Sequence, residues 1–217
     1  MEKIDEVVLE LRRELEKSKH TNVYTGMYAN RQLIRFQRFF FFQDKMSIML
    51  PEDFQEMDPD MARFKYPAEN RPELILTSED STVNFTLKYV DVPVREEELL
   101  SAAGQLRAVM GRLNPSNLFF ESDTLEREDG MAVWFDYKSY ALDDAMYNFM
   151  YLTDIDGHLL QGACNCPFAI YKEWKEIARQ VVMSVRDRTK EESNGGKTDS
   201  NRTLSYTKSV NVPQPAI

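Results

Sequence analysis

The turn signals between residues 118 and 166 constrain the fold more than any other feature of this sequence. Asp129-Gly130 and Asp156-Gly157 favour the two-residue type I′ turn of a β-hairpin, and each stands between β-rich runs. Leu142-Asp143-Asp144 makes a third, weaker break. The pattern predicts four successive antiparallel strands. We place them near residues 118–127, 131–140, 146–155 and 158–166.

Further strands and helices follow from hydrophobic periodicity. Apolar and polar residues alternate over 83–89, which predicts a strand with one buried face, and the turn Glu79-Asp80-Ser81 folds it back onto 74–78. Apolar stripes at helical spacing predict helices over 95–113 and 168–186. Because a helix with one apolar face needs a surface to bury it, these two helices are expected to pack on the sheet.

Two features lie towards the amino end. An apolar stripe over 2–19 predicts an amphipathic helix, and we favour packing on its own core, although the spacing alone also allows a partner. The four phenylalanines of 39–42 break the alternation expected of a strand with one wet face. We therefore predict that this strand is central and covered on both faces. Nearby charges are interpreted as protection against strand aggregation, namely Arg35, Arg38, Asp44 and Lys45.

Composition excludes several classes of function. The chain has 27 Lys and Arg residues against 36 Asp and Glu residues, so its formal charge is −9. A nucleic-acid partner is not expected, because such proteins need a basic face. No segment approaches the roughly 20 apolar residues of a membrane span, and the acidic amino end is unlike a signal peptide. We expect a cytoplasmic protein without a membrane partner.

The chain divides into three parts on these patterns. Residues 1–32 are predicted to hold the amphipathic helix and a linker, and residues 33–187 to form an α/β domain. From Arg188 onward Gly, Ser, Asn, Thr and Pro dominate, so residues 188–217 are predicted to be a disordered tail.

The order of elements resembles the PsbP-like superfamily over roughly residues 33–187. The resemblance rests on "MSIMLPEDF", on "DGMAVWFDY" and on "YKEWKEIARQVVMSV", and on their order along the chain. That superfamily includes the photosystem II PsbP subunit, a yeast Ran-binding import factor and bacterial DcrB-like proteins. The resemblance implies an α+β fold, an α/β/α sandwich around an antiparallel β-sheet. It also implies a binding or assembly factor without a shared catalytic centre, and we expect a bacterial member.

"MYLTDIDGHLL", residues 150–160, favours a competing hypothesis. An apolar strand followed by Asp-x-Asp-Gly is similar to the first motif of haloacid-dehalogenase-type phosphatases, in which Asp154 would attack phosphorus and Asp156 would act as acid and base. His158 replaces the usual threonine, and too little ordered chain follows for the remaining parallel strands. A divergent phosphatase is therefore kept only as a minor alternative.

Other chemical motifs are weak. Cys164 and Cys166 lie two apart on a predicted strand, so both thiols face the same way, but with His158 they make only three candidate zinc ligands. Core packing is favoured for both thiols, ahead of a redox role. "GGKT" at 195–198 lacks the earlier glycine, the strand and the helix of a phosphate-binding loop. No metal or cofactor is predicted.

The most informative polar segment is "ARFKYPAENRPELI", residues 62–75. Pro67 and Pro72 stiffen it, and donors and acceptors are dense between and beside them. A structural interpretation is an edge crossing with a local Glu69–Arg71 pair, and the functional one is a presented binding loop. Our candidate binding residues are Lys65, Tyr66, Glu69 and Arg71.

Together these features predict a non-enzymatic, protein-binding or accessory domain. The alternative from another class is a small-ligand carrier with an apolar pocket lined by Phe, Tyr and Met. A closed apolar cavity would favour the carrier, and a large exposed apolar patch beside residues 62–75 would favour the protein-binding domain.

Overall fold

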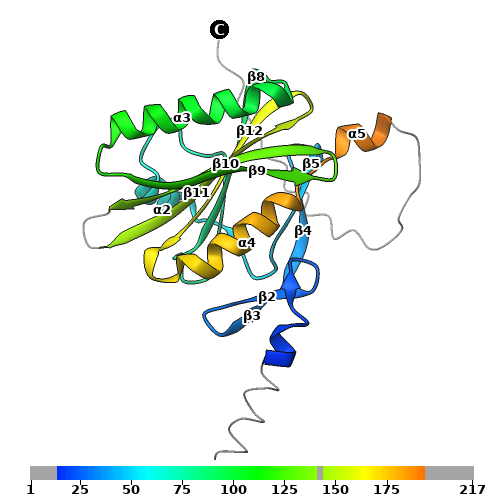
Figure 1. Cartoon of the computed structure of the whole chain (residues 1–217), viewed down its shortest axis with the longest axis vertical. Helices are drawn as coiled ribbons and strands as arrows, with labels where there is room; N and C mark the ends of the chain where they lie inside the picture. Colours follow the sequence, from blue (N-terminus) through cyan, green and yellow to red (C-terminus); the bar gives the residue numbers. More distant parts are fainter. Residues whose placement is uncertain (1–13, 141–143, 194–217) are drawn as a thin grey trace, which may run out of the picture.

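A computed structural model of the chain describes residues 14–140 and 144–193. Its main sheet has seven strands in the order β6-β7-β8-β12-β11-β10-β9, and every neighbouring pair is antiparallel (Figure 1). The strands are β6 (Gln55–Glu56), β7 (Leu74–Thr77), β8 (Asn84–Pro93), β9 (Leu118–Arg127), β10 (Gly130–Tyr140), β11 (Ala145–Ile155) and β12 (His158–Pro167).

The four-strand meander predicted for 118–166 is confirmed as β9 to β12, with bounds that differ by at most one residue. Asp156 and Gly157 have φ values of 54° and 72°, as the type I′ turn requires. The other hairpin differs, because Arg127 pairs with Gly130 and the loop therefore consists of Glu128 and Asp129. The prediction that Asp129-Gly130 forms the type I′ turn is wrong by one position. The third break falls mostly on residues 141–143, outside the described residues.

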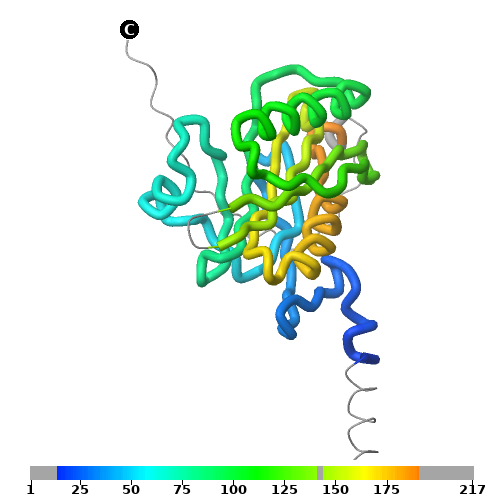
Figure 2. The backbone as a smooth tube through the Cα atoms, turned by 60° about the vertical axis from the view of Figure 1, so that its left-hand side comes forward, coloured from blue at the N-terminus to red at the C-terminus, as the bar shows by residue number. Residues whose placement is uncertain are grey.

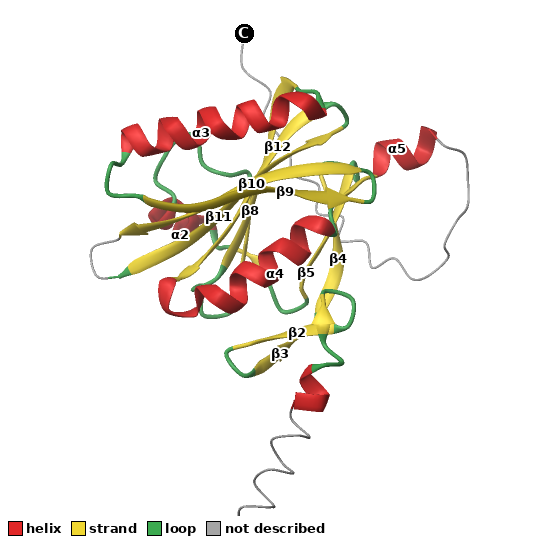
Figure 3. Ribbon diagram, viewed as in Figure 1, coloured by secondary structure: helices red, strands yellow, loops and turns green. Residues whose placement is uncertain are grey.

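The predicted helices cover the two faces of this sheet (Figure 3). α3 (Leu99–Leu113) follows a short 3-10 turn, η1 (Glu96–Glu98), and packs on β10 and β11. α4 (Tyr171–Met183) follows η2 (Phe168–Ile170) and packs against the opposite face. Each face has its own cluster of buried side chains, the larger under α4 and the smaller under α3. The predicted three-layer α/β/α sandwich around an antiparallel sheet is confirmed.

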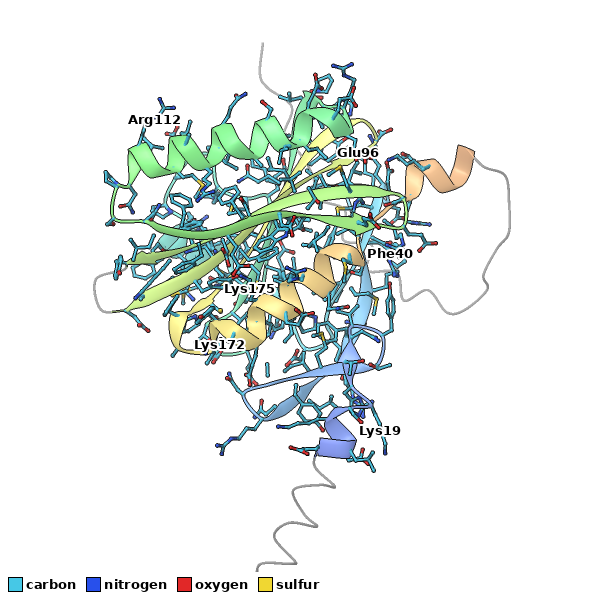
Figure 4. All side chains as sticks on the ribbon, in the orientation of Figure 1. Lys19, Phe40, Glu96, Arg112, Lys172 and Lys175 are labelled. Carbon is cyan, nitrogen blue, oxygen red and sulfur yellow. The ribbon has the colours of Figure 1, made fainter. Side chains whose placement is uncertain are left out.

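A second, three-stranded sheet corrects the prediction for the phenylalanine run. Its order is β13 (Arg186–Asp187), β5 (Met46–Pro51), β4 (Phe36–Phe41), so β4 is an edge strand and β5 is central. All six residues of β5 are buried. Phe39 and Phe41 pack on the core, whereas Phe40 is 40% exposed and lies under the Arg188 guanidinium (Figure 4). The run is unbroken because both faces of an edge strand are partly covered, not because the strand is central.

Two of the presumed protective charges make tertiary contacts instead. Arg38 Nη1 donates hydrogen bonds to Ser47 Oγ at 2.9 Å and to the Ser184 carbonyl oxygen at 3.3 Å. Lys45 Nζ lies 2.7 Å from Asp156 Oδ2 and so joins the β4–β5 hairpin to the β11–β12 hairpin. The Arg38 bonds join β4 to β5 and to the end of α4, and the Lys45 pair attaches the small sheet to the end of the large one.

The two ends of the chain contribute to the fold where they are described. β1 (Thr21–Asn22), β2 (Gly26–Ala29) and β3 (Gln32–Ile34) form a small sheet within the segment predicted as linker. Val23, Met27 and Ala29 from this segment are buried in the larger core. Residues 14–17 of the predicted amphipathic helix are helical, and residues 1–13 lie outside the described residues. After β13, α5 (Arg188–Ser193) begins the segment predicted as tail.

Gly162 on β12 lies directly opposite Tyr151 on β11, and the tyrosine ring occupies the space that a side chain would need. A Cβ atom added to Gly162 would lie 2.1 Å from Tyr151 Cζ, and Tyr151 is itself buried. We expect Gly162→Ala to lower the free energy of unfolding by about 1–3 kcal/mol, as overpacked cores do. A urea unfolding midpoint measures this. Gly104→Ala is the matched control, because nothing lies within 4 Å of its added Cβ.

Candidate functional site

The segment between β6 and β7 forms an arm that stands off the sandwich (Figure 2). It contains α2 (Pro59–Lys65), a helix that the sequence analysis missed. Asp58 is the N-cap, with Oδ1 accepting hydrogen bonds from the main-chain N–H groups of Asp60 and Met61, and Pro59 occupies the first turn. The helix ends at the residue before Tyr66-Pro67, as expected where proline restricts its predecessor. The Asp-Pro pair was the local signal that would have revealed it.

α2 presents apolar side chains to solvent. None of its seven residues is buried, and Phe64 is 82% exposed. Met61, three residues earlier and therefore on the same side of the helix, is 40% exposed. A single exposed apolar residue needs no explanation, and here a phenylalanine and a methionine form a small apolar patch on a helix without a buried residue. We call Met61 and Phe64 the α2 pair.

The four predicted binding residues follow the α2 pair along the chain, and the structure gives them two different roles. Lys65 Nζ donates to the Ser81 carbonyl oxygen. Tyr66 is half-buried, its OH donates to Asn165 Oδ1 at 3.3 Å, and burial raises the pKa of its phenol well above the ordinary value. These two residues anchor the arm to the body. Glu69 and Arg71 are exposed, and the described residues show no ion pair between them.

The anchor for Tyr66 belongs to a row of polar side chains that crosses the sheet. The row consists of residues that pair across successive strands, namely Tyr137, Asn148, Asn165, Asn84, Thr77 and Gln55. Asn165 Nδ2 donates to Asn148 Oδ1 at 2.7 Å, and Thr77 Oγ1 donates to Asn84 Oδ1 at the same distance. Asn84 and Asn148 are buried, and a buried amide without a hydrogen-bond partner would destabilise the fold. These bonds supply the partners. Through Asn165 this row supplies the hydrogen-bond acceptor for Tyr66.

Asp154 and Asp156, the two carboxylates of the phosphatase hypothesis, form ion pairs near the β11–β12 turn. Asp154 Oδ2 lies 3.0 Å from Lys190 Nζ, and Asp154 Oδ1 lies 3.6 Å from Arg127 Nη2. Asp156 occupies the β11–β12 turn and pairs with Lys45, which lowers the pKa of its carboxyl group. The strands on both sides are antiparallel, unlike the parallel sheet that the motif would need. We therefore find no support for Asp154 or Asp156 as reacting groups.

The two cysteines are buried in the larger core. Cys164 and Cys166 lie on the same face of β12, as predicted from their spacing. Burial raises the pKa of the Cys164 thiol well above its usual value and that of Cys166 to about 12. Both are therefore uncharged thiols at neutral pH. Across the residues described, His, Cys, Asp and Glu form no group of three or more that could hold a metal ion.

Two open hollows lie on the surface, and neither is the apolar pocket of a ligand carrier. One, of about 410 Å³, is lined by Glu96, Thr124, Leu125, Glu126, Arg127, Gly130 and Met131. The other, of about 210 Å³, lies among the amino-terminal strands and includes His20, Arg35 and Glu52 in its lining. Charged groups line both. Among the described helices, none is long and apolar enough to cross a membrane.

Comparison with solved structures decides the fold. The solution structure of cyanobacterial PsbP (CyanoP) from Synechocystis sp. PCC 6803 matches with a TM-score of 0.52 at 11% identity, over 75% of this chain and 98% of that one. The chain has the PsbP-like fold. The predicted resemblance is thereby confirmed at the level of the fold. No family model matches the sequence, and no curated protein matches it significantly.

Two further structures show lower similarity to this PsbP-like chain. The Ran-binding protein Mog1p of Saccharomyces cerevisiae matches with a TM-score of 0.48 at 10% identity, over 71% of this chain and 96% of that one. LpqN of Mycobacterium tuberculosis, which is involved in cell envelope biogenesis, matches with a TM-score of 0.45 at 9% identity, over 70% and 90% of the two chains.

Proposed function

We propose that this PsbP-like protein is a non-enzymatic accessory protein that binds a protein partner through its α2 arm. The observation that carries the proposal is the α2 pair, an exposed phenylalanine and methionine on a helix with no buried residue. These two side chains lie at the start of residues 62–75 and form a smaller apolar patch than the large one that the sequence analysis named as its criterion. We also propose that the protein is cytoplasmic.

The predicted binding residues fit this surface in two ways. Glu69 and Arg71 are exposed beside α2 and supply charged groups for a polar rim around the apolar pair. Lys65 and Tyr66 hold the arm in place through Ser81 and Asn165, so that less conformational freedom is lost when a partner binds. The partner that suits such a surface has an apolar pocket with both charge signs around it.

The test compares matched variants in one capture experiment. We expect Met61→Ala combined with Phe64→Ala to lose a specific partner from native lysate, because aromatic anchors contribute about 2 kcal/mol or more at an interface centre. That loss corresponds to about 30-fold in Kd. The unfolding midpoint should stay close to that of the wild type, because neither side chain is buried.

Leu113→Ala is the control for non-specific apolar capture. Leu113 lies on α3 and is 81% exposed, nearly the same as Phe64 at 82%. A partner that uses the α2 arm is retained by the Leu113 variant and lost by the arm variant. Equal capture of every protein by the arm variant and the wild type would contradict the proposed function.

A further inference from the structure

Apolar side chains are exposed together at the end of the main sheet where β9 begins and β10 ends (Figure 1). Leu118 and Phe120 of β9 and Tyr140 of β10 are 50%, 44% and 50% exposed. Phe168 of η2 is half-buried, and its ring centroid lies 6.1 Å from that of Phe120. Lys138 of β10 pairs with Leu118 across the two strands. We call these five residues the β9–β10 patch.

A β-bulge decides which side chains of β9 belong to this patch. The register of β9 against β10 shifts at Asp136, where Phe120 and Glu121 together oppose one residue. Such an extra residue reverses the side of the strand that the neighbouring side chains face. Phe119 consequently packs on the smaller core under α3, and Leu118 is left on the opposite, exposed side.

Asp136 holds the bulge in place. Its carboxylate is buried, with Oδ1 accepting the main-chain N–H of Glu121 at 2.7 Å and Oδ2 accepting the Tyr147 hydroxyl at 2.8 Å. Lys175 Nζ lies 2.9 Å from Asp136 Oδ2 and 2.9 Å from Glu121 Oε2. The two acidic groups at the bulge are therefore already compensated by Lys175, and the bulge presents Phe120 in a fixed position.

The ammonium group of Lys138 lies between two aromatic rings of the patch. Its Nζ is 4.9 Å from the ring centroid of Tyr140 and 4.4 Å from that of Phe168. Among the described residues, no ion pair includes Lys138. Asp144, which precedes β11, accepts a hydrogen bond from the Ala145 N–H instead. A molecule that covers the patch removes water from this ammonium group, and burying a charge without a partner is costly. A complementary occupant therefore carries an anionic group.

We propose that the β9–β10 patch binds a short acidic segment of another protein, with an apolar side chain against Phe120 and Phe168 and a carboxylate on Lys138. The aromatic rings supply apolar contact area, and the ammonium group supplies a charge-assisted hydrogen bond. The patch is separate from the α2 arm, and this inference does not depend on the proposed function.

The overall charge favours a short segment over an anionic membrane surface. The chain has a formal charge of −9, which opposes its approach to an extended anionic surface. A short segment contacts the patch alone, and charges more than about 8 Å away are largely screened at physiological ionic strength. The local charge of Lys138 then decides which segment binds.

Selection from a random peptide library on the full-length chain tests the proposal. We expect the wild type to enrich peptides that combine Asp or Glu with a large apolar residue. Lys138→Glu should instead enrich peptides with Lys or Arg in the acidic positions, because the sign of the charge is reversed. Lys17→Glu is the matched control, since Lys17 is also exposed and this variant should keep the wild-type selection.

Titration of a selected acidic peptide tests the apolar part of the patch. Phe120→Ala and Tyr140→Ala should each weaken its binding about tenfold, because aromatic anchors carry much of the affinity of an interface. Both side chains are about half exposed, and the unfolding midpoint of each variant verifies that the fold is kept. The variant with Met61→Ala and Phe64→Ala should bind this peptide as the wild type does.

Three results would overturn the proposal. The first is the absence of acidic enrichment, or the same enrichment by the wild type and Lys138→Glu. The second is loss of the selected peptide by the arm variant but not by Phe120→Ala, which would place the peptide on the α2 arm. The third is sedimentation of the wild type with phosphatidylserine vesicles that Lys138→Glu loses, which would make the patch a membrane contact.

Discussion

Replacing Arg127 with methionine is expected to lower the free energy of unfolding by about 3–5 kcal/mol. The Arg127 side chain is fully buried at the end of the main sheet, with Nη1 3.1 Å from Asp129 Oδ1 and Nη2 3.2 Å from the Asp154 carbonyl oxygen. Methionine fills a similar volume but leaves the two nearly buried carboxylates without this cation. Asp154 keeps its pair with Lys190, so the main cost is the lost compensation of Asp129 and the weakened compensation of Asp154, rather than a cavity.

The control for this substitution is Arg95→Met. Arg95 also contacts two carboxylates, those of Glu97 and Glu98, but its side chain is 71% exposed. Solvent screens such pairs, so the unfolding midpoint should not move measurably. Urea titrations of both variants give the comparison. Equal unfolding midpoints for Arg127→Met and Arg95→Met would contradict this prediction. The ion pairs of Arg127 with Asp129 and Asp154 would then not stabilise this end of the sheet.

The second large effect is expected at Ile48. Ile48 is fully buried on β5, the central strand of the small sheet, and Ile48→Ala should cost about 2–5 kcal/mol as a buried deletion. Its neighbour across the sheet is Phe39, and the adjacent Phe40 lies on the outward side of edge strand β4. Phe40→Ala should cost only about 1 kcal/mol, because the ring is partly exposed and contacts Arg188.

This pair of variants distinguishes the observed order of strands from the one predicted from the phenylalanine run. A central β4 would make Phe40→Ala the more damaging change, and a central β5 makes Ile48→Ala the more damaging one. Thermal or urea unfolding of the two single variants measures the difference directly. A larger loss for Phe40→Ala would contradict the assignment of β5 as the central strand.

Local sequence patterns predicted the meander, the two packing helices and the α+β class. These rest on local physics, since Asp156-Gly157 needs no tertiary contact to favour its turn and the alternation over 83–89 marks one face of a strand wherever the strand lies. The order of elements then indicated the PsbP-like fold, which the match to cyanobacterial PsbP confirmed. For the candidate site, the sequence indicated residues 62–75 and named Lys65, Tyr66, Glu69 and Arg71, but it singled out neither Met61 nor Phe64.

The three-dimensional arrangement was needed to assign the edge strands and to identify the side chains of the arm that face solvent. β4 and β5 are both mostly apolar, with Gln37 and Arg38 as the polar residues of β4 and Ser47 as that of β5. β5 is the central strand because β13, more than 130 residues later, pairs with it. Tyr66 and Arg71 are similar candidates from the sequence. Tyr66 is half-buried and donates a hydrogen bond to Asn165 on β12, whereas Arg71 is exposed. The burial of a side chain and the pairing of a strand depend on segments that are distant in the sequence. Local residue patterns do not identify which distant segment a strand or side chain will contact.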